Sequence, residues 1–241
     1  MRKLLTRRLV LLFVFALAAF MASDSMTTVT AGNVIAEPNP LLGEWAGPYG
    51  GVPPFDKVQV ALFKPALETA MAENLSEIDN LTRVRSAPTF DNTIVALEKA
   101  GHTLDRVTTV YGIWSSTMSN TEFQAVQREM APKLAAFNDQ ITQNEALFKR
   151  IETVYNSPDK KKLNAEQQRL VWLYYTNFVR SGAQLDTKAK ARLTEINQQL
   201  ATLFTKFSNN VLFEEDNQFV TLKSEDELKG LPQSVRDAES S

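Results

Sequence analysis

Apolar residues recur at steps of three and four along most of the chain after Phe63. This is the spacing of one face of an α-helix, so the pattern predicts a protein built from helices. We expect the first helix to run from Phe63 to about Leu81, with Pro65 in its first turn and Pro88 beyond its end. Its apolar face is Leu67, Met71, Leu75, Ile78 and Leu81.

A second helix is predicted from Ile94 to Trp114, after the residues of 89–93, which are typical of helix caps. Gly101 lies inside this pattern. Glycine costs roughly 1 kcal/mol relative to alanine within a helix, so Gly101 indicates a close contact or a bend.

Three further helices follow, each with a start signal or an apolar face. Thr121 and Gln124 form a predicted capping box for the third helix, and residues 145–155 form a shorter fourth one. Asn164 and Gln167 are expected to cap the fifth. Apolar side chains cover more than one face of this fifth helix, which predicts that it is central and surrounded: Leu170, Trp172, Leu173, Tyr174, Phe178 and Val179.

The longest helix is predicted to begin at Thr187, after a break at Gly182. Its apolar residues are spaced almost as in a heptad repeat, which favours antiparallel packing inside a helical bundle. This seam consists of Leu193, Ile196, Leu200, Leu203, Phe207 and Val211.

The last part of the chain changes character. Residues 219–222 are the best candidate for a strand, residues 224–228 for a helical turn, and residues 234–238 for the first turn of another helix. A single strand and a single helical turn are not stable alone. We therefore expect this region to be incomplete at its C-terminus. Helices that pack against an absent lobe should leave an exposed apolar patch larger than the few hundred Å² that is usual in monomers.

The N-terminal region has the layout of an export signal. Basic residues precede an apolar run from Leu9 to Phe20, and small polar residues follow. The run is too short to cross a bilayer core of roughly 30 Å, which needs about 20 helical residues. We interpret residues 1–31 as a signal peptide, with cleavage between 22 and 36. The alternative is an uncleaved anchor. The predicted product is periplasmic or secreted and has no stable membrane span.

Residues 37–58 are rich in proline and glycine and are predicted to form an extended arm ahead of a helical region, 59–241. The apolar side chains Leu41, Leu42 and Trp45, together with Tyr49, are expected to hold this arm against the folded body.

The amino-acid composition argues against several classes of function. The chain has 26 basic and 28 acidic residues, a balance that argues against a nucleic-acid partner. It has no cysteine and one histidine, His102, so thiol chemistry and a two-histidine zinc motif are excluded.

Three charged groups remain as candidates for chemistry. On a continuous helix Glu98, His102 and Asp105 share a face and could form a weak metal site, but a solvated helix surface is the better interpretation. The acidic run 214–216 and the basic turn 160–162 are also interpreted as solvated. The sequence therefore assigns no catalytic residue, no cofactor-binding residue and no metal ligand.

Several short segments occur in a characteristic order along the chain. They are Asn39-Pro40-Leu41-Leu42, Pro53-Pro54-Phe55-Asp56, Pro65-Ala66-Leu67, Thr89-Phe90-Asp91-Asn92-Thr93-Ile94, Ala96-Leu97-Glu98, Phe178 to Ala183, Leu200 to Leu203, Phe207 to Leu212, and Gly230-Leu231-Pro232. In this order they resemble the N-terminal region of the thimet oligopeptidase-like zinc metallopeptidases. The arm with Pro53-Pro54-Phe55-Asp56 and the exported N-terminus are similar to the peptidyl-dipeptidase (dipeptidyl carboxypeptidase) branch. One departure is Val60-Ala61-Leu62, where the family often has a Pro-Glu-His-type approach.

The resemblance implies an all-α, two-lobed enzyme with a deep channel that admits short peptides. In such an enzyme zinc is held by an H-E-x-x-H helix and a downstream glutamate, and none of these residues falls in the region that is similar here. The resemblance thus implies that this chain is a channel-wall portion, inactive alone, whose partners are short peptides and the missing C-terminal catalytic lobe. The alternatives are a non-enzymatic exported protein that binds peptides or a partner, and a helical scaffold unrelated to peptidases.

Overall fold

The structure is a computed structural model, and it describes residues 38–49, 51–222 and 224–238. The predicted signal peptide lies outside the described residues. Within them the predicted all-α fold is confirmed, since the only β-type pairing is an isolated bridge between Ala46 and Val52. The α-helices are α1 (Val60–Thr82), α2 (Ala96–Glu98), α3 (His102–Thr117), α4 (Thr121–Thr142), α5 (Glu145–Asn156), α6 (Ala165–Arg180), α7 (Thr187–Asn217) and α8 (Gln233–Ala238). Shorter 3-10 and π-helical turns are η1 (Phe55–Lys57), η2 (Phe90–Val95) and η3 (Pro158–Lys162).

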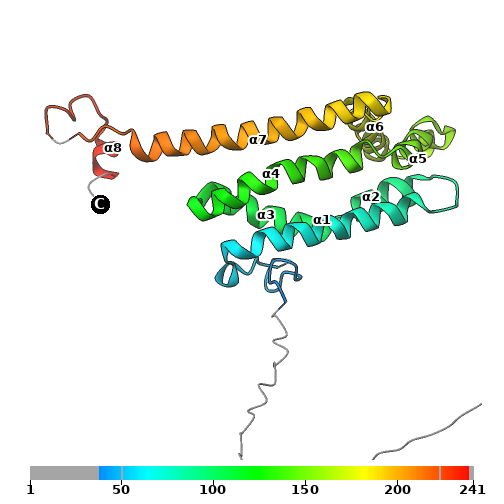
Figure 1. Cartoon of the computed structure of the whole chain (residues 1–241), viewed down its shortest axis with the longest axis horizontal. Coiled ribbons are helices and arrows are strands. Elements are labelled where there is room, and N and C mark those ends of the chain that lie inside the picture. The colour runs from blue at the N-terminus through cyan, green and yellow to red at the C-terminus, as the bar shows by residue number, and fades with distance from the viewer. Residues whose placement is uncertain (1–37, 50, 223, 239–241) are drawn as a thin grey trace, which may run out of the picture. The chain divides into compact units, whose positions relative to one another are not determined.

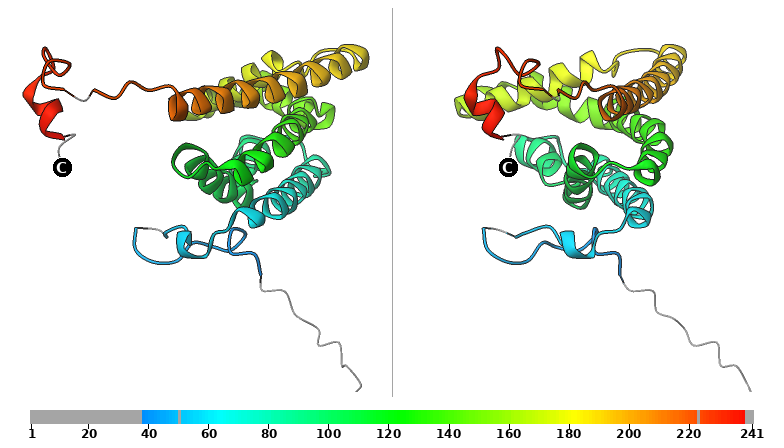
Figure 2. Two further views of the ribbon diagram at one scale, coloured as in Figure 1. Left: turned by 60° about the vertical axis from the view of Figure 1, so that its left-hand side comes forward. Right: turned by 90° about the vertical axis from the view of Figure 1, so that its left-hand side faces the viewer.

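The helices between α1 and α7 form layers (Figures 1 and 2). Helix α1 packs on α3 and α4, and α7 packs on the other side of α4. Helices α5 and α6 pack on each other, next to η2. Helix α7 runs antiparallel to α4, because Thr194 contacts Gln143 at the end of α4 while Asn197 contacts Asp139 one turn earlier.

The first hydrophobic core lies between α1, α3 and α4 and is centred on Phe63, which is fully buried. Its ring meets those of Tyr111, Trp114 and Phe123 edge-on, at centroid distances of 5.8, 5.5 and 5.2 Å. Such edge-to-face contacts favour one defined arrangement of the aromatic rings in addition to burying apolar area. The arm enters the same core through Leu41, which is 1% exposed.

The second core lies between η2, α5 and α6, and it contains a buried cation. Ile94, Leu147 and Ile151 are fully buried there. Arg150, which is 7% exposed, donates hydrogen bonds from α5 to the carbonyl of Val84 at 2.9 Å and to Asn92. These contacts fix the loop between α1 and η2 on the surface of α5.

The arm between residues 38 and 58 is held by polar contacts as well as by Leu41. The Asn39 amide donates to the carbonyl of Leu62 at 2.9 Å, and Arg106 pairs with Glu44 at 3.0 Å. Trp45 is packed against the first core, whereas Tyr49 is fully exposed and is not an anchor.

The predicted second helix is wrong as a continuous element. Gly101 has φ +83° and separates α2 from α3, and its amide donates to the Glu77 carboxylate at 2.7 Å. A Cβ at this position would lie 2.8 Å from the Asn74 amide nitrogen. The close contact and the bend expected at Gly101 are both present, and they end a helix.

Some of the other local predictions are confirmed by the structure, and others are wrong. The capping box of Asn164 and Gln167 is present, but α4 is capped by the Asn120 side chain and not by Thr121. Pro65 lies inside α1 because that helix already begins at Val60.

The strand predicted at 219–222 is absent, and Phe219 and Val220 are 72% and 85% exposed. No described segment pairs with it, so its backbone gains no ladder of hydrogen bonds.

Helix α6 is not central, contrary to the prediction. Trp172 and Leu173 are 36% and 40% exposed, and only Val171 and Phe178 of this helix are buried. The Arg169 guanidinium lies 3.9 Å from the centre of the Trp172 ring, which covers part of the indole. A cation can shield an aromatic face at the surface, so an apolar residue on the outer side of a helix does not require a second layer.

Candidate functional site

The best candidate for a functional surface is the outer side of α7. Polar contacts join the start of this helix to the end of α4: Lys190 donates to the Gln143 carbonyl at 3.2 Å, and Asn197 donates to Asp139 at 2.7 Å. Lys190 is the one buried residue of α7. Hydrogen bonds therefore help to hold the first turns of α7 to α4.

The apolar residues of α7 lie on a different side of the helix and form what we call the apolar stripe. Ile196 and Val211 mark its ends and are 36% and 39% exposed, while Leu203 and Phe207 near the middle are 61% and 66% exposed. The apolar stripe consists of Ile196, Leu200, Leu203, Phe204, Phe207 and Val211. It is an exposed apolar surface on the described part of the chain.

The prediction that the heptad-like seam of α7 packs inside the bundle is wrong for the described part of the chain. The periodicity correctly indicates an apolar face, but α4 takes the neighbouring polar face. Exposed apolar side chains at helical spacing are suited to bind another helix, and they cannot perform proton transfer or nucleophilic attack. The arrangement is an exposed apolar face of α7.

The three residues weighed as a weak metal site are not brought together. Glu98 ends α2 before the break at Gly101, and His102 begins α3 after it. The Tyr174 hydroxyl donates to the Glu98 carboxylate at 2.6 Å. Burial raises the pKa of Tyr174 well above its ordinary value, and the contact with Glu98 adds to the effect. Glu98 thus serves to join α2 to α6.

The charged runs also have structural roles or face solvent. Lys162 pairs with Asp159 at 2.6 Å, and Lys160 lies over the Tyr155 ring at 3.9 Å. Residues 214–216 at the end of α7 are exposed. A hollow of about 230 Å³ between residues 88–91 and 157–163 is lined by charged, apolar and hydroxyl side chains. One of them is Ser157, whose hydroxyl oxygen accepts a hydrogen bond from the Asp159 amide at 3.2 Å.

The described residues do not fit a zinc ion. No three His, Cys, Asp or Glu side chains are grouped among them closely enough to hold a metal. A catalytic zinc normally takes three protein ligands and keeps one open position. We therefore derive no step of a reaction from these residues.

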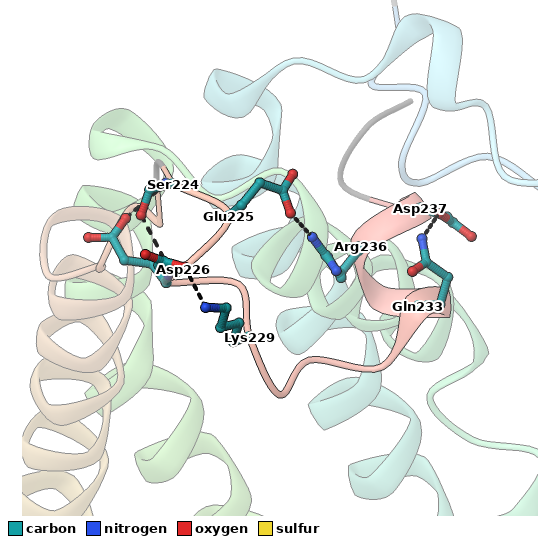
Figure 3. A network of polar contacts seen from close by, with 8 residues as sticks. Ser224, Glu225, Asp226, Lys229, Gln233, Arg236 and Asp237 are labelled. Atoms are coloured by element: carbon teal, nitrogen blue, oxygen red, sulfur yellow. Dashed lines mark hydrogen bonds and ion pairs between the residues drawn. The ribbon is translucent and has the colours of Figure 1, made fainter.

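The segment after α7 is held by its own polar contacts (Figure 3). Glu225 forms an ion pair with Arg236, Asp226 pairs with Lys229 at 2.6 Å, and Gln233 donates to Asp237 at 2.7 Å. The pair of Glu225 with Arg236 links the turn after residue 223 to α8, while the other two contacts lie within the turn and within α8.

Among the helices that the structure describes, none has the length and apolar character to cross a bilayer.

Comparison of the sequence with known proteins identifies a family and several relatives. The sequence profile of the family described as "Neurolysin/Thimet oligopeptidase, N-terminal domain" matches residues 66–190, from α1 to the start of α7. The chain is 35% identical over 174 residues to the dipeptidyl carboxypeptidase of Salmonella typhimurium and 33% identical to that of Escherichia coli. It is 26% identical over 200 residues to oligopeptidase A of Haemophilus influenzae.

These relatives are longer proteins. The matches with the two dipeptidyl carboxypeptidases cover 72% of this chain but 25% of each relative, and the match with oligopeptidase A covers 83% of this chain and 28% of that relative. The chain therefore spans about a quarter of the length of the curated relatives that it matches. By its sequence, the chain belongs to the neurolysin/thimet oligopeptidase family, and its residues 66–190 correspond to the N-terminal domain of that family.

Proposed function

We propose that this chain is the N-terminal, channel-wall portion of an exported zinc-dependent oligopeptidase of the peptidyl-dipeptidase type. The observation that carries the proposal is the match over 174 residues to two proteins named dipeptidyl carboxypeptidase. The apolar stripe on α7 supports it, because a surface of this kind is suited to pack against the rest of a larger enzyme. The substrates of the complete enzyme would be short peptides.

The division of labour in that enzyme follows from the residues at hand. The helices from α1 to α7 provide rigid, packed surface, and the described residues provide no cluster of metal ligands. In this proposal a catalytic lobe is the partner of these helices, and that lobe would hold the zinc that activates water for hydrolysis. In this proposal residues 1–31 direct export to the periplasm or the medium, residues 37–58 form the arm, and residues 59–241 form the helical portion.

A first test uses the chain alone. The purified 241-residue chain is incubated with zinc and a short peptide blocked at its N-terminus, and the products are separated by chromatography. We expect no cleavage. Release of C-terminal dipeptides, abolished by a chelator, would overturn the assignment of the chain as a non-catalytic portion.

A second test supplies the catalytic part. In a chimaera, residues 38–238 replace the matching segment of the Salmonella dipeptidyl carboxypeptidase. We expect the chimaera to release C-terminal dipeptides when zinc is present and to lose this activity on chelation. A second chimaera carries Leu203→Glu for comparison. This substitution places a charge on the apolar stripe and should lower the activity or the stability of the chimaera.

The result that would contradict the proposal is a folded chimaera that binds zinc and leaves the peptide intact. That outcome would favour the alternative, a non-enzymatic exported helical protein that binds peptides or another protein.

A further inference from the structure

The order of residues along the apolar stripe has a symmetry of its own. Ile196 and Val211 lie at equal sequence separations from the midpoint between Leu203 and Phe204, and so do Leu200 and Phe207. When two copies of such a helix are laid side by side in opposite directions, each apolar residue of one copy therefore meets an apolar residue of the other. A two-fold symmetric interface requires this kind of self-complementary surface.

The charges at the two ends of α7 favour the same orientation. Arg192 lies one turn before Ile196 and is exposed, in an ion pair with Glu195 at 2.9 Å. Glu214 lies just beyond Val211 and is exposed. In an antiparallel pair centred between Leu203 and Phe204, Arg192 of one copy comes level with Glu214 and Glu215 of the other. In a parallel pair the acidic residues 214–216 of both copies would lie together and repel each other.

We propose that the apolar stripe of α7 binds the apolar stripe of a second copy of this chain, as an antiparallel two-fold dimer centred on Leu203 and Phe204. The leucine and isoleucine side chains pack between the phenylalanine rings of the opposite helix. Arg192 and Glu214 close the two ends of the interface.

The exposed area is sufficient for a specific dimer. Phe204 and Phe207 are each 66% exposed, and a fully buried aromatic side chain covers roughly 150–250 Å². Together with the aliphatic residues, the apolar stripe offers on the order of 600 Å² per copy, or about 1,200 Å² in the dimer. Specific protein–protein interfaces begin at about this size, and the fully apolar centre favours association further.

This inference does not rest on the proposed function. It uses only the exposed side of α7, and its experiments are done on the chain without any catalytic lobe. If a catalytic lobe covers the apolar stripe in the chimaera described above, the chimaera will be monomeric while the chain alone is dimeric. Failure of one proposal therefore leaves the other standing.

The first experiment measures the mass of the full chain in solution by sedimentation velocity over a range of concentrations. We expect a species of twice the 27.0 kDa chain mass to form as the concentration rises. Leu203→Glu should abolish this species and leave a folded monomer by circular dichroism. The matched control is Thr202→Glu, which adds the same charge at the neighbouring exposed position outside the apolar stripe and should leave the dimer intact.

The second experiment tests the antiparallel orientation by cross-linking, for which the chain is well suited because it contains no cysteine. Leu203→Cys should be joined to itself by a short thiol-specific cross-linker, because the two copies of this residue lie next to the symmetry axis. Ile196→Cys and Val211→Cys should each remain single, since two copies of either residue lie about 22 Å apart along the helix axis. A mixture of the two variants should give a cross-linked pair.

Two results would overturn the proposal. Cross-linking of Ile196→Cys with itself would show a parallel pair or a different interface. A wild-type chain that remains monomeric at every concentration, with its apolar stripe still able to bind a hydrophobic dye, would show that this surface has another occupant.

Discussion

Replacing Arg150 by methionine should destabilise the chain far more than the same replacement at an exposed arginine. Arg150 is 7% exposed, and it contacts two segments that precede it in the chain, at Val84 and at Asn92. Its guanidinium donates to the Val84 carbonyl at 2.9 Å, to the Asn92 carbonyl at 3.2 Å and to the Asn92 side-chain oxygen at 2.9 Å. Methionine keeps most of the apolar stem and removes every one of these donors.

The size of the effect follows from two opposing terms. Each hydrogen bond from a charged group contributes about 1.5–3 kcal/mol, so three of them contribute roughly 5–9 kcal/mol. Burial of the guanidinium costs several kcal/mol in the native protein, a cost that methionine removes. The same burial lowers the pKa of Arg150 below its ordinary value. The net loss on replacement is about 3 kcal/mol, because the buried acceptors on Val84 and Asn92 lose the guanidinium that donates to them.

Urea unfolding followed by circular dichroism at neutral pH measures this loss directly. About 3 kcal/mol corresponds to a fall in the melting temperature of roughly 6–12 °C for a chain of this size. The control is Arg83→Met. Arg83 pairs with Asp79 at 3.0 Å, but both side chains are more than half exposed, and such pairs contribute little, at most about 1 kcal/mol.

The reasoning would be refuted if Arg150→Met and Arg83→Met lowered the free energy of unfolding by similar small amounts. That result would mean that water or a shifted loop satisfies the carbonyls of Val84 and Asn92 when the guanidinium is removed.

Three further predictions use matched positions in the same chain. Gly101→Ala should lower the free energy of unfolding by about 1–2 kcal/mol, because φ is +83° there and the new methyl group meets Asn74. Gly112→Ala, in the open middle of α3, should instead raise the free energy of unfolding by up to about 1 kcal/mol. Urea titration measures both variants, and equal effects would contradict this prediction. Phe63→Ala in the first core should lower the free energy of unfolding by about 3–5 kcal/mol, because the ring is fully buried. Phe219→Ala should lower it by less than about 0.5 kcal/mol, because that side chain is 72% exposed. Thermal unfolding compares the two, and similar losses would count against the core as described. Burial raises the pKa of Tyr111 to about 12, so the native state favours the neutral phenol. The free energy of unfolding should therefore fall as the pH rises from the ordinary tyrosine value of 10.0 towards 12. Denaturation measured across this pH range should show a shallower fall for Tyr111→Phe, and an unchanged slope would refute the role of Tyr111.

The local sequence signals were sufficient where the interacting residues are neighbours in the chain. The Asn164 and Gln167 capping box forms as predicted, because both partners lie within one helical turn. The Thr121 prediction failed by one position, since Asn120 can make the same contact with the backbone of the first turn. Gly101 was recognised as unusual, but its positive φ depends on Glu77, a residue of α1 that accepts from its amide.

The sequence by itself determined that the chain is helical, that α7 has one apolar side, and which family the chain belongs to, because periodicity and motif order are properties of the chain alone. Only the tertiary structure decided which side of each helix is covered. Lys190 and Asn197 hold α7 to α4 and leave the apolar stripe exposed, and Trp172 on α6 faces outward under Arg169. The physical reason is that hydrophobic burial has no direction: an apolar face specifies that a partner is needed, and the choice of partner depends on contacts between residues far apart in the chain.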